Sequence, residues 1–233
     1  MLSAFKTALK ETATYLFMAL KALYFWRSPP PVGSVEALAH YVDTRSKFVA
    51  QTALFSYIKT RAGTRYVSLY EDELFTRSAN IAKWEIWLSS LCDMATYAVA
   101  AIGRRSAARP DELSALAAHI VDGVLAAEEV PAERPQGFGD IRAAYARRAH
   151  ETRWNQIEPG EGPFQGSLDA LIEWAPIADE LKILDELAVR NSMRFKWKKV
   201  RDQFETLVDA DAVLADWRAR GGRSTSDQEG EAG

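Results

Sequence analysis

The sequence is poor in cysteine, since Cys92 is the only one among 233 residues. A single cysteine cannot form an internal disulfide, and it excludes a zinc site built from several cysteines. Cys92 lies within an apolar pattern, so we expect a buried thiol that packs rather than reacts. The cysteine content favours a reducing compartment, and we predict a cytoplasmic protein.

Histidine is also scarce, and familiar catalytic motifs are missing. The three histidines, His40, His119 and His150, each fall off the apolar stripe of the helix predicted around them. The chain has no Glu-x-x-His pair, which argues against a di-iron bundle. It also has no Gly-x-Ser-x-Gly motif, which weakens a serine hydrolase hypothesis. Residues 160–166 are rich in glycine but lack the Gly-Lys-Ser/Thr ending of a phosphate loop. We therefore predict no cofactor and no metal.

Excess charge of one sign and a long hydrophobic run are missing as well. The formal net charge is −3, with 26% charged and 48% hydrophobic residues. This balance gives no general attraction to nucleic acid, which we do not expect as a partner. The apolar run 12–26 is too short for a comfortable membrane span. Glu11 and Lys21 interrupt the layout of a signal peptide.

Alternating strand patterns are absent too, whereas helical periodicity recurs along the whole chain. We predict an all-α fold, a helical bundle of about six to eight helices with long central helices. Three segments are distinguished: an amphipathic N-terminal helix at 1–28, a bundle domain at 29–220 and a disordered tail at 221–233. The expected bundle helices are 34–60, 68–103, 110–128, 140–157, 167–208 (interrupted at Pro176 and with a possible break near Asn191 and Ser192) and a last helix that Asp209 or Asp211 caps.

The apolar face of the long segment 68–102 contains a line of polar side chains, at Glu71, Ser78, Glu85, Ser89 and Thr96. A buried carboxylate must find a partner, because an unpaired buried charge is very costly. Ser68 to Glu71 matches a capping box, which predicts a structural role for Glu71. The small hydroxyl residues allow close helix packing. Glu85 is left without a local explanation.

Two arginines on predicted apolar stripes, Arg45 and Arg148, are candidate partners for Glu85. A guanidinium can meet a carboxylate with two parallel hydrogen bonds. Three interpretations of Glu85 stay open: a buried ion pair that fixes helix register, a ligand-binding or catalytic carboxylate, and simple exposure.

Two segments are candidate interaction surfaces. Residues 190–201 carry six basic and no acidic side chains, with aromatic residues interleaved. Trp197 fits a core stripe, so the charges can form a solvated face, meet an acidic protein partner, or meet lipid or nucleic acid. The first helix has more apolar surface than one stripe needs, and it can lie on a membrane, dock on a partner or complete the bundle. The residues chosen for these surfaces are Lys6, Lys10, Trp26, Arg194, Lys196, Lys198 and Lys199.

Three short motifs carry a resemblance to a known family: Gly63-Thr64-Arg65-Tyr66, Glu71-Asp72-Glu73-Leu74-Phe75 and Asn80-Ile81-Ala82-Lys83-Trp84. They resemble the central segment of an uncharacterised helical family of alphaproteobacteria, over roughly residues 24–100. Some members of that family carry an esterase label, but the resemblance supplies no catalytic residues. It implies a bacterial, cytoplasmic protein.

These observations predict a non-enzymatic helical interaction or adaptor protein of the bacterial cytoplasm. A protein partner is expected, and the first helix provides a means of contact with the inner membrane. The alternative is a hydrolase or small-ligand enzyme that uses Glu85 in a pocket between helices.

Overall fold

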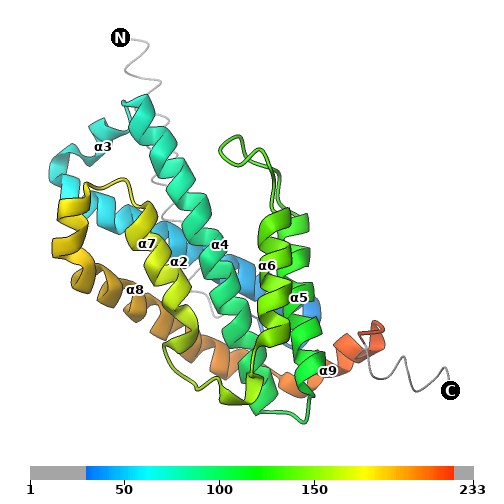
Figure 1. The fold of residues 1–233 in the computed structure, drawn as a ribbon. Helices are drawn as coiled ribbons and strands as arrows, with labels where there is room; N and C mark the ends of the chain where they lie inside the picture. Colours follow the sequence, from blue (N-terminus) through cyan, green and yellow to red (C-terminus); the bar gives the residue numbers. More distant parts are fainter. Residues whose placement is uncertain (1–29, 223–233) are drawn as a thin grey trace. The chain divides into compact units, whose positions relative to one another are not determined.

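The computed structural model describes residues 30–222. The chain divides into two compact units, residues 1–31 and 32–233, and nearly all described residues belong to the second (Figure 1). The predicted first helix, with Lys6, Lys10 and Trp26, lies outside the described residues, and so does nearly all of the predicted tail.

The second unit is an all-α bundle, which confirms the predicted fold class. Two long helices, α2 (Val35–Ala62) and α4 (Glu73–Arg104), are linked by a short helix, α3 (Tyr66–Leu69). The remaining helices are α5 (Pro110–Ala126), α6 (Gly139–Glu151), α7 (Gln165–Trp174), α8 (Asp179–Leu207) and α9 (Ala210–Ala219). Within residues 30–222 the only β pairing is an isolated bridge between Val32 and Val208.

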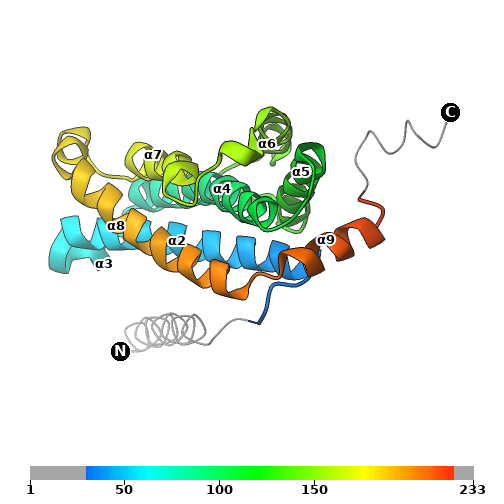
Figure 2. The same ribbon diagram turned by 90° about the horizontal axis from the view of Figure 1, so that it is seen from below.

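The helices form two layers, which lie one above the other in Figure 2. One layer holds α4 with α5, α6 and α7, and the other holds α2 with α8 and α9. From Met94 to Ile102, all residues of α4 are buried. Neighbouring helices surround this part of α4, and its many alanines let their backbones come close. The helix is long and apolar enough to span a membrane, but 83% of its most apolar stretch is buried inside the bundle. Burial on all sides is typical of a core helix.

Local capping signals set the starts of several helices. The Ser34 side chain accepts a hydrogen bond from Ala37 N, Asp209 accepts from Ala212 N, and Pro110 is the first residue of α5, all as predicted. Three other predictions are wrong. The cap of α4 is Asp72, which accepts from Phe75 N at 2.9 Å, so the capping box at Ser68 and Glu71 does not form.

The other two corrections concern where α6 ends and whether α8 is interrupted. Helix α6 ends at Glu151, before the predicted residue 157, because the chain turns there into a short 3-10 helix at Trp154–Gln156. Helix α8 continues through Asn191 and Ser192 without a break. Its buried side chains repeat at helical spacing on both sides of that point, so packing holds the helix together. They are Val189, Met193, Trp197, Val200 and Phe204.

Candidate functional site

Glu85 is neutralised by an arginine from a loop. Arg134, in the segment between α5 and α6, places Nη1 2.7 Å from Glu85 Oε1. Its Nη2 bonds the Asp140 carboxylate, and its Nε donates to the Gly137 carbonyl at 2.9 Å. The Arg134 side chain is only 8% exposed, while that of Glu85 is 23% exposed. One guanidinium therefore fastens the loop to α4 and to the start of α6.

Neither Arg45 nor Arg148 is the partner of Glu85, so that prediction is wrong. Arg45 is buried, and its guanidinium lies 5.2 Å from the centre of the Tyr41 ring. Arg148 points to a different carboxylate, with Nη2 3.8 Å from Asp93 Oδ1. Among the three interpretations of Glu85, the contacts favour a structural ion pair.

Asp93 is the most deeply buried carboxylate of α4, and sequence reasoning missed it. Its exposed fraction is 0%, and Oδ2 accepts a hydrogen bond from Ser167 N at 2.6 Å. Ser167 is the third residue of α7, and the residue preceding α7, Phe164, has no side chain that could cap the helix. Asp93 thus supplies from α4 the capping carboxyl oxygen that α7 lacks locally.

Other side chains and the α7 backbone pack closely around this cap. The Ser167 hydroxyl donates to Phe164 O at 3.0 Å and accepts from Trp197 Nε1 at 3.1 Å, which connects α7 to α8. A Cβ atom at Gly166 would lie 3.0 Å from Asp93 Oδ1. Glycine at this position therefore permits the close approach of the carboxylate to the helix end.

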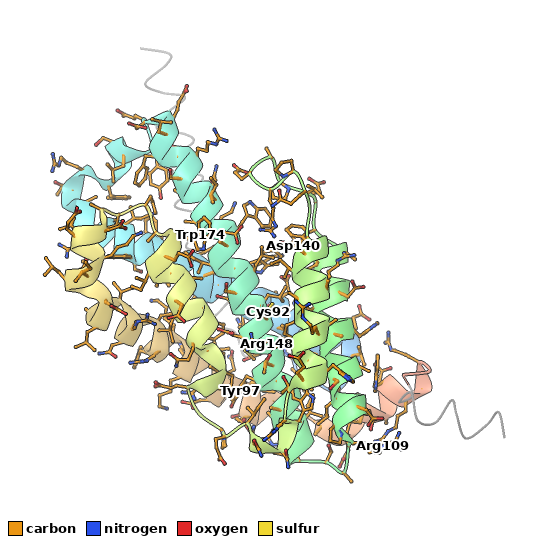
Figure 3. The ribbon with its side chains drawn as sticks, viewed as in Figure 1. Cys92, Tyr97, Arg109, Asp140, Arg148 and Trp174 are labelled. Carbon is orange, nitrogen blue, oxygen red and sulfur yellow. The ribbon has the colours of Figure 1, made fainter. Side chains whose placement is uncertain are left out.

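Burial changes the protonation of this region. Desolvation raises the pKa of Asp93 to about 7, although Ser167 and the Arg148 charge act to lower it. Burial and the neighbouring Asp93 raise the pKa of Cys92 to about 12. Figure 3 shows Cys92 and Arg148 where α4 meets α6. The thiol is protonated at neutral pH, so Cys92 is a packing residue rather than a nucleophile.

The described part of the chain holds no arrangement typical of a metal or triad site. No group of three His, Cys, Asp or Glu side chains comes together in residues 30–222. All three histidines are exposed, as predicted.

A small cavity of about 220 Å³ lies between α2, α7 and α8. Its lining includes the buried side chains of Tyr57 and Val189, and Asp185, which forms an ion pair with Arg61. Burial and the Asp185 charge raise the pKa of Tyr57 to about 12. This hydroxyl stays protonated at neutral pH and cannot act as a base there.

The most unusual surface is the outer face of α8. Large apolar side chains here are strongly exposed: Ile183 at 76%, Leu184 at 77%, Leu187 at 71% and Phe195 at 74%. At 100° per residue they share one side of the helix with Glu180, Asn191, Arg194 and Lys198. We call these eight residues the outer face of α8. Exposed apolar surface on one side of a helix, rimmed by polar residues, marks interaction sites.

Charge along α8 is divided between its two halves. The first half carries the acidic residues Asp179, Glu180, Asp185 and Glu186, with Lys182 as its one base. From Arg190 to Arg201 all six charged side chains are basic. On the outer face itself the charged residues are Glu180 near one end and Arg194 and Lys198 near the other, where Arg194 also pairs with Glu161 and Lys198 with Asp202. A partner on this face would therefore meet charges of opposite sign at its two ends.

The predicted basic surface is engaged in part by contacts within the chain, including an ion pair between Lys198 and Asp202. Arg194 lies 3.3 Å from Glu161, and burial lowers the pKa of the half-buried Lys196. Lys198 and Lys199 are exposed, and Trp197 is buried in the core as predicted. Sequence reasoning missed Ile183, Leu184 and Leu187. The available signal was an apolar pattern at 181–189 too wide for one buried stripe.

No protein-family model matches this chain, and no curated protein or solved structure matches it either. The resemblance to an alphaproteobacterial helical family therefore stays a prediction.

Proposed function

We propose that this chain is a non-enzymatic, all-helical interaction protein of the bacterial cytoplasm. It binds a protein partner through the outer face of α8. The observation that carries this proposal is the exposure, above 70% each, of Ile183, Leu184, Leu187 and Phe195 on one side of a well-formed helix. Leaving this much apolar surface in water is unfavourable, and covering it on binding would recover free energy.

The partner surface is specified by the chemistry of this face. It is an amphipathic helix with an apolar stripe, basic where it meets the acidic half of α8 and acidic where it meets residues 190–201. The single cysteine, half-buried and protonated, and the family resemblance support the cytoplasmic location.

The alternative, an enzymatic function that uses a buried carboxylate, has less support than an interaction protein. A catalytic carboxylate needs access to a substrate. Glu85 is held by Arg134 at 2.7 Å, and Asp93 is completely buried beneath α7. The cavity beside Tyr57 is lined by neither of them.

Contact with the inner membrane through residues 1–28 remains part of the proposal. It is motivated by the apolar excess of that segment. Membrane fractionation should compare the intact chain with a chain that begins at residue 29. Equal, fully soluble behaviour of both would remove the membrane contact from the proposal.

Affinity capture from a lysate of the source cell tests the partner proposal. The intact chain is compared with Leu187→Glu, on the outer face, and with Leu74→Glu. Leu74 is 76% exposed in the first turn of α4, which makes it a matched control. We expect a partner protein that the wild type and Leu74→Glu retain and that Leu187→Glu loses. Identical captured proteins for all three chains would contradict the assignment of the face.

A further inference from the structure

We infer that the helix covering the outer face of α8 is α8 of a second copy of this chain, in antiparallel orientation. This inference rests on the proposed function, since it names the partner for the same face. It is carried by the division of charge along the helix. In an antiparallel pair Glu180 of each copy meets the basic end of the other face, with Arg194 and Lys198, whereas parallel pairing would set like charges together.

The register follows from the spacing of residues on the face. Leu184, Leu187, Asn191, Arg194 and Lys198 alternate at intervals of three and four, which is the repeat of helices that pack side by side. If the two-fold axis of the dimer passes near Val189, each of these positions lies opposite a position of the second copy. Glu180 is then level with Lys198 of the second copy, and Leu187 with its Asn191.

The same register also places the exposed aromatic residue. Ile183 is level with Phe195 of the second copy, and Leu184 with the aliphatic stem of its Arg194. A shift by one heptad toward the helix start would set Leu184 level with Leu187 of the second copy, but it leaves Lys198 beyond the start of the second α8 and shortens the overlap. The register about Val189 therefore combines opposite charges with the longer contact, about 27 Å from Glu180 to Lys198 at 1.5 Å per residue.

The length of this contact also indicates how tight the assembly is. One helix against one helix covers less area than a permanent dimer interface, so association should depend on concentration. Charge pairs at the rim add orientation more than affinity. We therefore expect a reversible dimer.

Sedimentation velocity on the full chain, from micromolar to submillimolar concentration, tests the inference. The wild type should move from its 26.0 kDa mass toward twice that value. Leu187→Glu should raise the dissociation constant at least about tenfold, because each dimer loses two buried leucines. Leu74→Glu should leave it unchanged. The circular dichroism of both variants should match the wild type, since both leucines lie outside the core.

Charge reversal tests the orientation. Lys198→Glu and Glu180→Lys should each weaken association, and the double variant should restore it, because the two positions are level across the two-fold axis. A wild type that stays at the monomer mass, or equal effects of Leu187→Glu and Leu74→Glu, would overturn the dimer. A double variant no better than either single variant would overturn the antiparallel register.

These outcomes separate the inference from the proposed function. If the wild type is monomeric but captures a partner in a Leu187-dependent manner, the second copy is wrong and the interaction face stands. If neither behaviour depends on Leu187, both are wrong.

Discussion

Replacing Asp93 by asparagine should change how the stability of the chain depends on pH. The pKa of this carboxyl rises from 3.8 to about 7 on folding, chiefly because burial disfavours its charge. Between these two values the folded state holds a proton that the unfolded chain has released. The free energy of unfolding therefore falls as pH rises through this window.

The size of this fall follows from the two pKa values. Each tenfold change in an equilibrium constant corresponds to about 1.4 kcal/mol, so the full window from 3.8 to about 7 corresponds to about 4 kcal/mol. An asparagine side chain in place of Asp93 would be neutral at every pH, and its oxygen can still accept from Ser167 N. Asp93→Asn should therefore gain stability relative to the wild type, by up to about 4 kcal/mol, between pH 4 and pH 7.5.

Urea unfolding at a series of pH values measures this difference. The matched control is Asp202→Asn, which removes an exposed carboxylate 2.5 Å from Lys198. A surface pair contributes at most about 1 kcal/mol, so the control should follow the wild type within that limit. A difference between Asp93→Asn and wild type that stays flat with pH, or falls as pH rises, would refute the reasoning.

Three further substitutions test other contacts, each by urea unfolding. Arg134→Met should cost about 2–3 kcal/mol, near the lower end for breaking a buried pair, because the Glu85 side chain is 23% exposed; a loss below about 0.5 kcal/mol would contradict the role of the pair. Asp72→Ala should cost about 1 kcal/mol and Ser68→Ala close to nothing, because Asp72 is the cap of α4; the reverse order would restore the capping box. Gly166→Ala should destabilise by about 1–2 kcal/mol, since its Cβ would lie 3.0 Å from the carboxylate beneath it. Helix propensity alone predicts a gain of about 1 kcal/mol there, so a more stable variant would count against the close approach.

The helices were predictable because their signals are local. Ser34, Pro110 and Asp209 each act on the next few backbone amides, and the sequence contains both partners of that interaction. The start of α4 was misplaced for a related reason. Ser68 and Asp72 both have a capping side chain, and the choice depends on α3, a single turn that has no periodicity to reveal it.

The contacts of the buried carboxylates were not predictable from periodicity. Arg134 lies in an irregular loop, where no stripe indicates which helix it meets. Asp93 lies where α4 is buried on all sides, and a one-stripe description of that helix leaves it on the outside. Both contacts join segments more than forty residues apart, so they depend on the tertiary arrangement.

For the outer face of α8, the sequence showed the apolar pattern but did not show that it is exposed. Ile183, Leu184 and Leu187 have the spacing of core residues, yet the bundle leaves them exposed. A periodic pattern states which residues share a side of a helix, but it does not state whether the chain itself covers that side.

Lysine footprinting tests most directly the claim that this face is where the protein binds. Lys198 lies on the outer face with its side chain 61% exposed, and Lys59 lies near the end of α2 and is also exposed. Acetylation of the two lysines, read by mass spectrometry, should be compared between dilute purified chain and the chain in concentrated source-cell extract. We predict that Lys198 becomes protected in the extract while Lys59 stays reactive. Unchanged reactivity of Lys198, or equal protection of both lysines, would contradict the account.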